Sequence, residues 1–545
     1  MNDRLSIRGM LVDVHVQKIY PAEVIIEKER IISIEEVDEN SVPPHFILPG
    51  FIDSHVHIES SMLVPSEFAR LAVVHGTVAT VSDPHEIANV CGMQGVEYMI
   101  ENGRTVPFKF NFGAPSCVPA TGFETAGAVI NATHIDELLR REEILYLSEM
   151  MNFPGVLNGD AEVMQKILTA QKYKKPVDGH APGLVGEQAE KYIDAGISTD
   201  HECFTKEEAL DKLKFGMKII IREGSAARNF DALAGLLHDH ADMMMFCSDD
   251  KHPDSLVEGH ISQLCARAVA MEIDIFKVLK AACVNPVNHY KLKVGLLRKN
   301  DFADLILVKD LRSFKVLATY INGQLVAENG NSLLTKHQAG TVNNFHSPAI
   351  ELKSIIFPKG NSSQVPVIEA LDGQLITNKI FTDASSLVAG EELRSNTDLD
   401  LLKIVVVNRY SASKPSTGFI KNFGLKRGAI ASSVAHDSHN IVAVGADDES
   451  LVKAINLVIA KKGGISCVDG EKEMILPLPV AGLMSNEDGY KIATQYSEMD
   501  KAAKNLGSTL SAPYMTLSFM ALLVIPHLKM SDLGLFDGDA FKLIT

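Results

Sequence analysis

The chain has 545 residues, of which 46% are apolar and 22% are charged, so it can bury several domains' worth of core and does not have the composition of a disordered protein. Its formal net charge of -17 argues against binding to nucleic acid or to an anionic membrane surface. The seven cysteines are scattered and odd in number, and no apolar leader or spanning segment is visible, so we expect a soluble cytoplasmic protein.

Short runs that alternate apolar and polar residues open the chain and return far downstream. They predict strands at residues 9–16, 22–27, 30–35, 304–308 and 314–321. The last of these leads into an Asn322-Gly323 hairpin turn. Because neither set is large enough to bury a sheet face alone, we expect one small composite β-domain, a β-sandwich, from residues 1–48 and 296–335.

The middle of the chain, residues 49–295, alternates short apolar strands with helical stretches. The strands end near His55, Asp83, Gly113, Glu149, His180, His201, Arg222 and Asp249. The mean spacing of about 28 residues fits one strand and one helix per unit, and eight such units make a (β/α)8 barrel. The interval between His180 and His201 is short, so a doubly wound open sheet is the alternative.

A polar, loop-like stretch follows residue 335 and separates the barrel from the rest of the chain. Beyond it, residues 403–407 and 441–445 predict strands and residues 449–461 predict a helix. We therefore expect a third, α+β domain over residues 345–545, and an α/β protein of three domains in all.

The first cluster whose side chains could carry out chemistry is His55-Val56-His57 at a strand end. Residues two apart on a strand point to the same face, so the two imidazoles can bind one divalent metal together. Two structural histidines at a strand terminus are the alternative. The metal hypothesis gains weight because Glu149, His180, His201 and Asp249 stand at later strand ends. Together they suffice for two ions sharing a ligand, and such donors suit Zn²⁺, Mn²⁺ or Fe²⁺.

Three ionisable residues, Asp83, His85 and Glu86, follow the second barrel strand. Glu86 could be a general acid or base toward a substrate nitrogen, and Asp83 could hold a neighbour by hydrogen bonding. His85 could be a metal ligand, although such a residue more often orients its neighbours. The segment could also simply begin a helix, since a turn followed by a helix start is typical of Asp-Pro.

Later polar clusters are less specific. Beside a metal-bound water, Asp249 could also accept that water's proton. Arg222 and Glu223 could contact substrate, or they could only make ordinary structural contacts within their loop. In the C-terminal region, the run from His436 through His439 to Asn440 could reach the barrel mouth, bind an extra ion or cap a turn. We take Arg222, Glu223, His436 and His439 as candidate substrate-binding residues.

Other chemistries lack their motifs. The sequence contains no G-x-x-x-x-G-K-[ST] loop and no G-x-S-x-G elbow. It also contains no C-x-x-C pair, which excludes the small zinc deaminases even though His57-Ile58-Glu59 matches part of their signature.

These residues resemble the amidohydrolase superfamily and, within it, the bacterial type of adenine deaminase. The resemblance spans essentially the whole chain and is carried by residues 49–61, 83–87, 148–156, 178–183, 199–202, 248–250 and 428–440. Many binuclear relatives bridge their metals with a carboxylated lysine, whereas Glu149 stands at that position here, as in adenine deaminases. One departure is Asn408-Arg409-Tyr410-Ser411, where a stretch richer in His and Gly is expected, so a role for this segment is in doubt.

The resemblance implies hydrolytic deamination of adenine to hypoxanthine and ammonia. It assigns the metal ligands, with Glu149 bridging, as His55, His57, Glu149, His180, His201 and Asp249. Hydroxide would attack C6 of the purine, Asp249 would take its proton, and Glu86, held near Asp83, would protonate a ring nitrogen. The metal is expected to be manganese or iron, with zinc as an alternative, and the assembly to be a homodimer.

Three competing interpretations are weighed against this one. Another amidohydrolase acting on a cyclic amide, of the dihydroorotase or imidazolonepropionase type, is disfavoured by Glu149 and by the C-terminal domain. A metal-binding scaffold without activity is disfavoured by the presence of Glu86 and Asp249. A purine-binding regulatory module would need a partner-binding segment, and none is visible.

Overall fold

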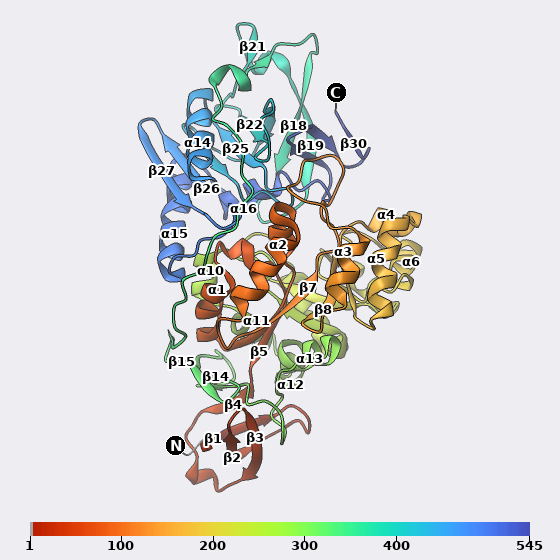
Figure 1. Cartoon of the computed structure of the whole chain (residues 1–545), viewed down its shortest axis with the longest axis vertical. Coiled ribbons are helices and arrows are strands. Elements are labelled where there is room, and N and C mark those ends of the chain that lie inside the picture. The colour runs from red at the N-terminus through yellow and green to blue at the C-terminus, as the bar shows by residue number, and fades with distance from the viewer. Residues whose placement is uncertain (1–3, 545) are drawn as a thin grey trace.

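The computed structural model describes residues 4–544, which form three bodies stacked along the long axis (Figure 1). A β-sheet lies at the end that holds the N-terminus, a barrel lies in the middle, and a C-terminal α+β body lies at the opposite end. No helix among the described residues is long and apolar enough to cross a membrane.

The first sheet joins strands from both sides of the barrel in the chain. Its N-terminal strands are β1 (Arg4–Asp13), β2 (Lys18–Glu27), β3 (Arg30–Glu36) and β4 (Phe46–Pro49). Its later strands are β13 (Leu305–Val308), β14 (Val316–Ile321), β15 (Gln324–Glu328) and β16 (Asn331–Ser332). β4 joins the two sets, because it pairs parallel to β1 and antiparallel to β13. The hairpin between β14 and β15 turns at Asn322-Gly323, both at positive φ.

Eight parallel strands form the barrel, in chain order. They are β5 (Phe51–Val56), β6 (Thr77–Ser82), β7 (Lys109–Ala114), β8 (Ile144–Met150), β9 (Val177–Gly179), β10 (Thr199–Asp200), β11 (Lys218–Arg222) and β12 (Met244–Cys247). A bridge between Val177 and Ile197 links β9 to the β10 side, and one between Val56 and Asp249 closes β12 onto β5. The barrel is thus closed, which decides against the open-sheet alternative.

Helices cover the outside of the barrel and follow its strands. They are α1 (Pro65–Ala72), α2 (His85–Gly103), α3 (Ala132–Leu139), α4 (Phe153–Asn158), α5 (Ala161–Lys172), α6 (Gly186–Asp194), α7 (Lys206–Lys214), α8 (Phe230–Leu233), α9 (Leu237–His240), α10 (Pro253–Glu258), α11 (Ile261–Ala270), α12 (Ile275–Leu279) and α13 (Asn285–Tyr290). Local sequence sets their starts: Asp160 accepts the N–H of Val163 at 3.0 Å, and Thr205 accepts that of Glu208 at 3.2 Å.

The C-terminal body is built on an eight-stranded sheet of order β19-β18-β23-β22-β25-β24-β26-β27. In chain order its strands are β18 (Gln364–Ala370), β19 (Thr377–Asp383), β22 (Leu401–Val407), β23 (Ser416–Lys421), β24 (Ala429–Ser432), β25 (Ile441–Gly445), β26 (Gly464–Asp469) and β27 (Lys472–Pro477). Smaller strands are β17 (Phe357–Pro358), β20 (Val388–Ala389), β21 (Glu392–Leu393), β28 (Leu528–Ser531), β29 (Gly534–Asp537) and β30 (Lys542–Leu543). The helices are α14 (Asp448–Lys461), α15 (Gly489–Asn505) and α16 (Pro513–Phe519).

Barrel and C-terminal body share a hydrophobic core. One cluster of buried apolar side chains runs from Val12 and Phe51 to Leu517 and Met530. The chain also pairs across the junction, because Leu63 forms a parallel bridge with Ser485. The C-terminal body is therefore packed onto the barrel rather than tethered to it.

Candidate functional site

A cluster of buried histidines and carboxylates lies where the barrel strands end. On β5 and just beyond it, the Nε2 atoms of His55 and His57 lie 3.1 Å apart. Asp249 Oδ1 lies 3.5 Å from the first and 3.2 Å from the second. The i, i+2 spacing does bring both imidazoles to one point, and Asp249 completes a group of three donors.

Closure of the barrel positions Asp249. Its N–H donates to the carbonyl of His55 at 3.0 Å, and the N–H of His57 donates to its carbonyl at 3.4 Å. Asp249 has a φ of 53°, in the left-handed region that non-glycine residues seldom occupy. One guanidinium contact holds its side chain, since Arg222 Nη1 donates to Asp249 Oδ2 at 2.8 Å. The same arginine also pairs with Glu202.

The two carboxylate oxygens of Glu149, on β8, face different histidines. Oε1 lies 3.3 Å from His57 Nε2. Oε2 lies 2.8 Å from His180 Nδ1 and 3.2 Å from His201 Nε2. A carboxylate in this position can be shared by two ions, one on the His57 side and one on the His180 side.

The donor set fits divalent metals. Donor atoms bound to one ion at about 2.0–2.2 Å stand roughly 3 Å apart, and the 3.1–3.5 Å separations around His57 are close to that value. Burial alone would lower the pKa of His57, but Asp249 and Glu149 raise it well above its usual value. A buried site whose carboxylates favour positive charge this strongly suits a divalent cation.

Asp83 and His85 form a pair beside Glu149. Asp83 Oδ1 accepts the N–H of His85 at 3.0 Å, and its other oxygen lies 3.0 Å from His85 Nδ1. The same ring nitrogen lies 3.5 Å from Glu149 Oε1. Asp83 thus orients His85 toward the cluster, and His85 belongs to a further group of possible metal donors.

Glu86, the first-turn carboxylate of α2, is held by side chains from outside the barrel. Two histidines of the C-terminal body contact it: His436 Nδ1 meets Oε1 and His439 Nε2 meets Oε2. Asp83 instead holds His85. Burial would raise the pKa of Glu86, but His436, His439 and His85 lower it well below its usual value. The expectation places Glu86 near Asp83, and the side chains in contact with the Glu86 carboxylate come from a distant part of the chain.

The cavity at this site is small. About 20 Å³ of free volume remains, room for about one water molecule. The lining includes five of the six expected metal ligands (His55 is the exception), Glu86, and five residues that were not candidates for the site, Met151, Glu202, Asp250, Leu375 and Leu522. His436 and Asp437 close it from the C-terminal side. Sequence adjacency could have pointed to Glu202 and Asp250, which directly follow His201 and Asp249.

The other candidate substrate-binding residues lie outside this lining. Arg222 is 2% exposed and its guanidinium is engaged by Glu202 and Asp249. Glu223 pairs with Arg267 at 2.6 Å, away from the cavity. His439 lies behind Glu86.

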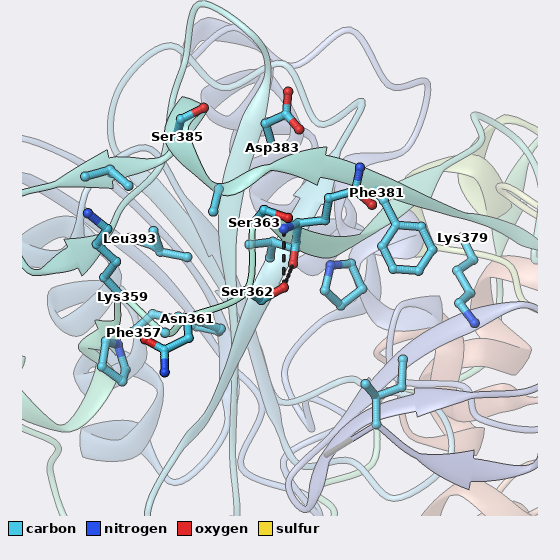
Figure 2. Close-up of a pocket in the computed structure, with 18 of the residues that line it drawn as sticks. Phe357, Lys359, Asn361, Ser362, Ser363, Lys379, Phe381, Asp383, Ser385 and Leu393 are labelled. Carbon is cyan, nitrogen blue, oxygen red and sulfur yellow. Dashed lines mark hydrogen bonds between the residues drawn. The ribbon is translucent and has the colours of Figure 1, made fainter.

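A larger cavity of about 1280 Å³ lies in the C-terminal body, apart from the cluster. Figure 2 shows its side chains, among them Phe357, Lys379 and Phe381, spread along loops and strands instead of converging on one point. No histidine is among the described residues that line it. We therefore place the chemistry at the barrel mouth and not in the roomier groove.

The chain is similar to known proteins along nearly its whole length. The model of the amidohydrolase family matches residues 46–326, and that of the adenine deaminase C-terminal domain matches residues 374–542. A protein named adenine deaminase from Sulfurovum sp. (strain NBC37-1) is 53% identical over 541 residues, which are 99% of both chains. The chain belongs to the adenine deaminase family of amidohydrolases.

One more relative and one solved structure also match part or all of the chain. The protein named adenine deaminase from Salinibacter ruber is 53% identical over 545 residues, 99% of this chain and 98% of the relative. Among solved structures, a beta-aspartyl dipeptidase from Fervidobacterium islandicum AW-1 aligns with 60% of this chain and 98% of its own, at 16% identity and a TM-score of 0.46.

Proposed function

We propose that the chain hydrolyses adenine to hypoxanthine and ammonia. The observation that carries the proposal is the meeting of two parts in one cavity: the Glu149-centred cluster of the barrel, and His436 and Asp437 of the C-terminal body. The barrel cluster is the part shared with amidohydrolases at large, whereas the C-terminal body matches the adenine deaminase domain model. Relatives named adenine deaminase align along the whole chain.

The proposed ligands form two groups that share Glu149. His55, His57 and Asp249 would hold one ion, and His180 and His201 the other. Mn²⁺ is the proposed metal, with Fe²⁺ or Zn²⁺ as alternatives. When bound, the metal pair supplies a water acidic enough to lose a proton near neutral pH.

The remaining groups move and hold protons. Asp249 is placed to accept a proton from the attacking water, and Arg222 keeps its carboxylate oriented. Glu86 lines the cavity and would pass a proton to a ring nitrogen of adenine, which makes C6 more electrophilic. Water then adds its oxygen at C6 and gives one proton to Asp249, which passes it to the amino nitrogen. The bond from C6 to that nitrogen breaks and ammonia leaves, and the hydroxyl proton that remains at C6 returns to Glu86 as the carbonyl of hypoxanthine forms. Asp83 serves by orienting His85.

Binding requires the site to open. A purine is larger than the single-water space that remains, so the side chains that close the mouth must separate when adenine enters. Leu375, Leu522, His436 and Asp437 come from the C-terminal body, which is thus part of the entrance.

One substrate panel tests the proposal. Purified, manganese-loaded protein is incubated with adenine, adenosine, dihydroorotate or buffer, while ultraviolet absorbance and ammonia are followed. We expect ammonia release and conversion to hypoxanthine with adenine alone. Turnover of dihydroorotate without turnover of adenine would favour the cyclic-amide alternative, and no turnover with full metal occupancy would favour the silent scaffold. The homodimer stays a prediction that sedimentation velocity can test.

A further inference from the structure

The carboxylate of Glu86 contacts two histidines that lie about 350 residues away in the sequence. It stands in the first turn of α2, on the barrel, whereas His436 and His439 lie in the loop between β24 and β25 of the C-terminal body. Figure 1 shows α2 at the junction of the two bodies. All three side chains are at most 2% exposed, so no solvent competes for these contacts. Each histidine takes a different oxygen of the carboxylate.

The backbone fixes which nitrogen of His439 carries the proton. The N–H of Ala435 donates to His439 Nδ1 at 3.1 Å. A ring nitrogen that accepts a hydrogen bond carries no proton, so the proton of the imidazole is on Nε2, which donates to Glu86 Oε2. Burial lowers the pKa of His439, which favours this neutral form. His439 is therefore a donor of fixed direction.

This tautomer also decides against a third metal ion. Glu86, His436 and His439 form a group of possible metal donors. A protonated Nε2 has no free lone pair, however, so His439 cannot ligate an ion from the atom that faces Glu86. In addition, each nitrogen directly contacts its own oxygen, whereas the donors around His57 stand 3.1–3.5 Å apart.

His436 approaches Glu86 from the cavity side. Its Nδ1 contacts Oε1, and its Nε2 has no hydrogen-bond partner among the described residues and lies 3.8 Å from Asp250 Oδ1. Burial would lower the pKa of His436, but the charges of Glu86 and Asp250 raise it to about 9. His436 thus keeps a proton toward the carboxylate that it touches.

The loop that carries both histidines is held rigidly. Arg409 Nη1 donates to the carbonyl of His439 at 3.3 Å, and the hydroxyl of Tyr410 donates to that of Ser438 at 2.5 Å. The N–H of His439 donates to the carbonyl of Ala435 at 2.7 Å. Because the backbone of the loop is fixed by these bonds, the imidazoles of His436 and His439 have fixed positions.

We propose that His439 and His436 are positioning residues that hold Glu86 at the point from which it transfers a proton to the substrate. The C-terminal body would then be part of the catalytic apparatus, since it supplies the groups that orient an acid/base residue of the barrel. This inference rests on the proposed function. A displacement of about 1 Å at such a group costs roughly 10²-fold in rate, so the orientation matters for turnover.

Matched amide substitutions test the geometry. The amide nitrogen of Gln can reach the place of a histidine Nε2, and that of Asn the place of Nδ1. At position 439, where Nε2 donates, His439→Gln should keep kcat within about 10-fold and His439→Asn should lose about 10²-fold. At position 436, where Nδ1 contacts Glu86, the order should reverse, with His436→Asn the more active variant. The backbone conformation does not disfavour His439→Asn in its comparison with His439→Gln, because position 439 has a φ of 54°, which Asn tolerates.

Three further readouts separate positioning from simple structural damage. KM and bound metal should stay within a few-fold of wild type in all four variants. The limb of the kcat profile that reports Glu86 should move to higher pH in His439→Asn, since a carboxylate that loses a donor binds its proton more tightly, and should stay in place in His439→Gln. His346→Gln, at an exposed histidine of the C-terminal body, is the control and should match wild type.

The outcomes are distinct. Equal losses for Asn and Gln at both positions, or kcat losses that follow metal loss, overturn the positioning roles. If the wild type does not deaminate adenine, the proposed function fails instead. The inference is then decided by a crystal structure of His439→Asn, where the carboxylate of Glu86 should have moved from its wild-type place, and an unmoved carboxylate overturns it.

Discussion

At the scale of single residues, Glu149 organises the site. Its two oxygens face opposite groups of histidines, so one side chain links both halves of the cluster. Loss of one carboxylate oxygen and of its charge should weaken the binding of both ions, because each ion would lose an anionic donor.

Glu149→Gln is therefore expected to bind less metal than wild type, which should hold about two ions per chain. The measurement is metal per chain by mass spectrometry after dialysis. Glu223→Gln is the matched control, since Glu223 pairs with Arg267 outside the cavity and its loss should leave occupancy unchanged. Full occupancy in Glu149→Gln would remove Glu149 from the ligand set.

A second residue of note is Lys529, a fully buried lysine with no carboxylate partner among residues 4–544. Its Nζ donates to the carbonyls of Leu375 at 2.6 Å and Phe519 at 2.9 Å. Burial lowers its pKa to about 7. A neutral amine has two N–H groups, which match the two carbonyls, and Leu375 lines the cavity that holds Glu86.

This makes stability depend on pH in a specific direction. Because the folded pKa lies below the unfolded value, the unfolded chain binds more protons between about pH 7 and 10, so the free energy of unfolding gains up to about 1.4 kcal/mol per pH unit there. Below pH 7 the cost of the buried charge is present in full. Relative to Lys529→Met, wild type should gain thermal stability from pH 6.5 to pH 8.5. A difference in melting temperature that does not vary with pH would contradict a neutral Lys529.

At the scale of elements, the loop between β24 and β25 connects the two bodies. Arg409, two residues beyond β22, is fully buried, and within the described part of the chain its guanidinium bonds to neutral groups, the carbonyls of His439 and Ala481 and the amide oxygen of Asn343. The segment Asn408–Ser411, which departs from the expected family pattern, is thus the support of the histidine loop.

Arg409→Lys tests this support. A lysine keeps the charge but cannot reach three acceptors with a planar fork, so the loop should loosen and Glu86 should lose its fixed place. We expect kcat to fall about 10-fold or more with unchanged metal content. Arg427→Lys, at a surface pair with Asp469, is the control. Wild-type kcat in Arg409→Lys would show that the loop keeps its shape without this arginine.

The strands of the barrel could be predicted because their signals are local. Apolar runs followed by polar residues placed the strand ends within about two residues, and parallel strands bring such ends to one mouth. The partner of Glu86 could not be predicted in this way, since neither the polar run at His436 nor the spacing of α2 says which distant loop meets which helix. The order of strands in the C-terminal sheet is non-local in the same sense.

At the scale of the whole molecule, the C-terminal body closes the mouth that the barrel leaves open. The two bodies share buried apolar side chains, and the cavity between them takes its proposed metal ligands from one body and part of its lining from the other. The central claim is that this joint cavity deaminates adenine, with Glu86 as the group that passes a proton to the ring.

The most direct test compares wild type with Glu86→Gln, both manganese-loaded, for ammonia release from adenine. Gln keeps the size of the side chain but cannot carry the proton, so metal content should be unchanged and kcat should fall about 10²–10⁴-fold. Deamination by Glu86→Gln at the wild-type rate, with equal metal content, would contradict the account.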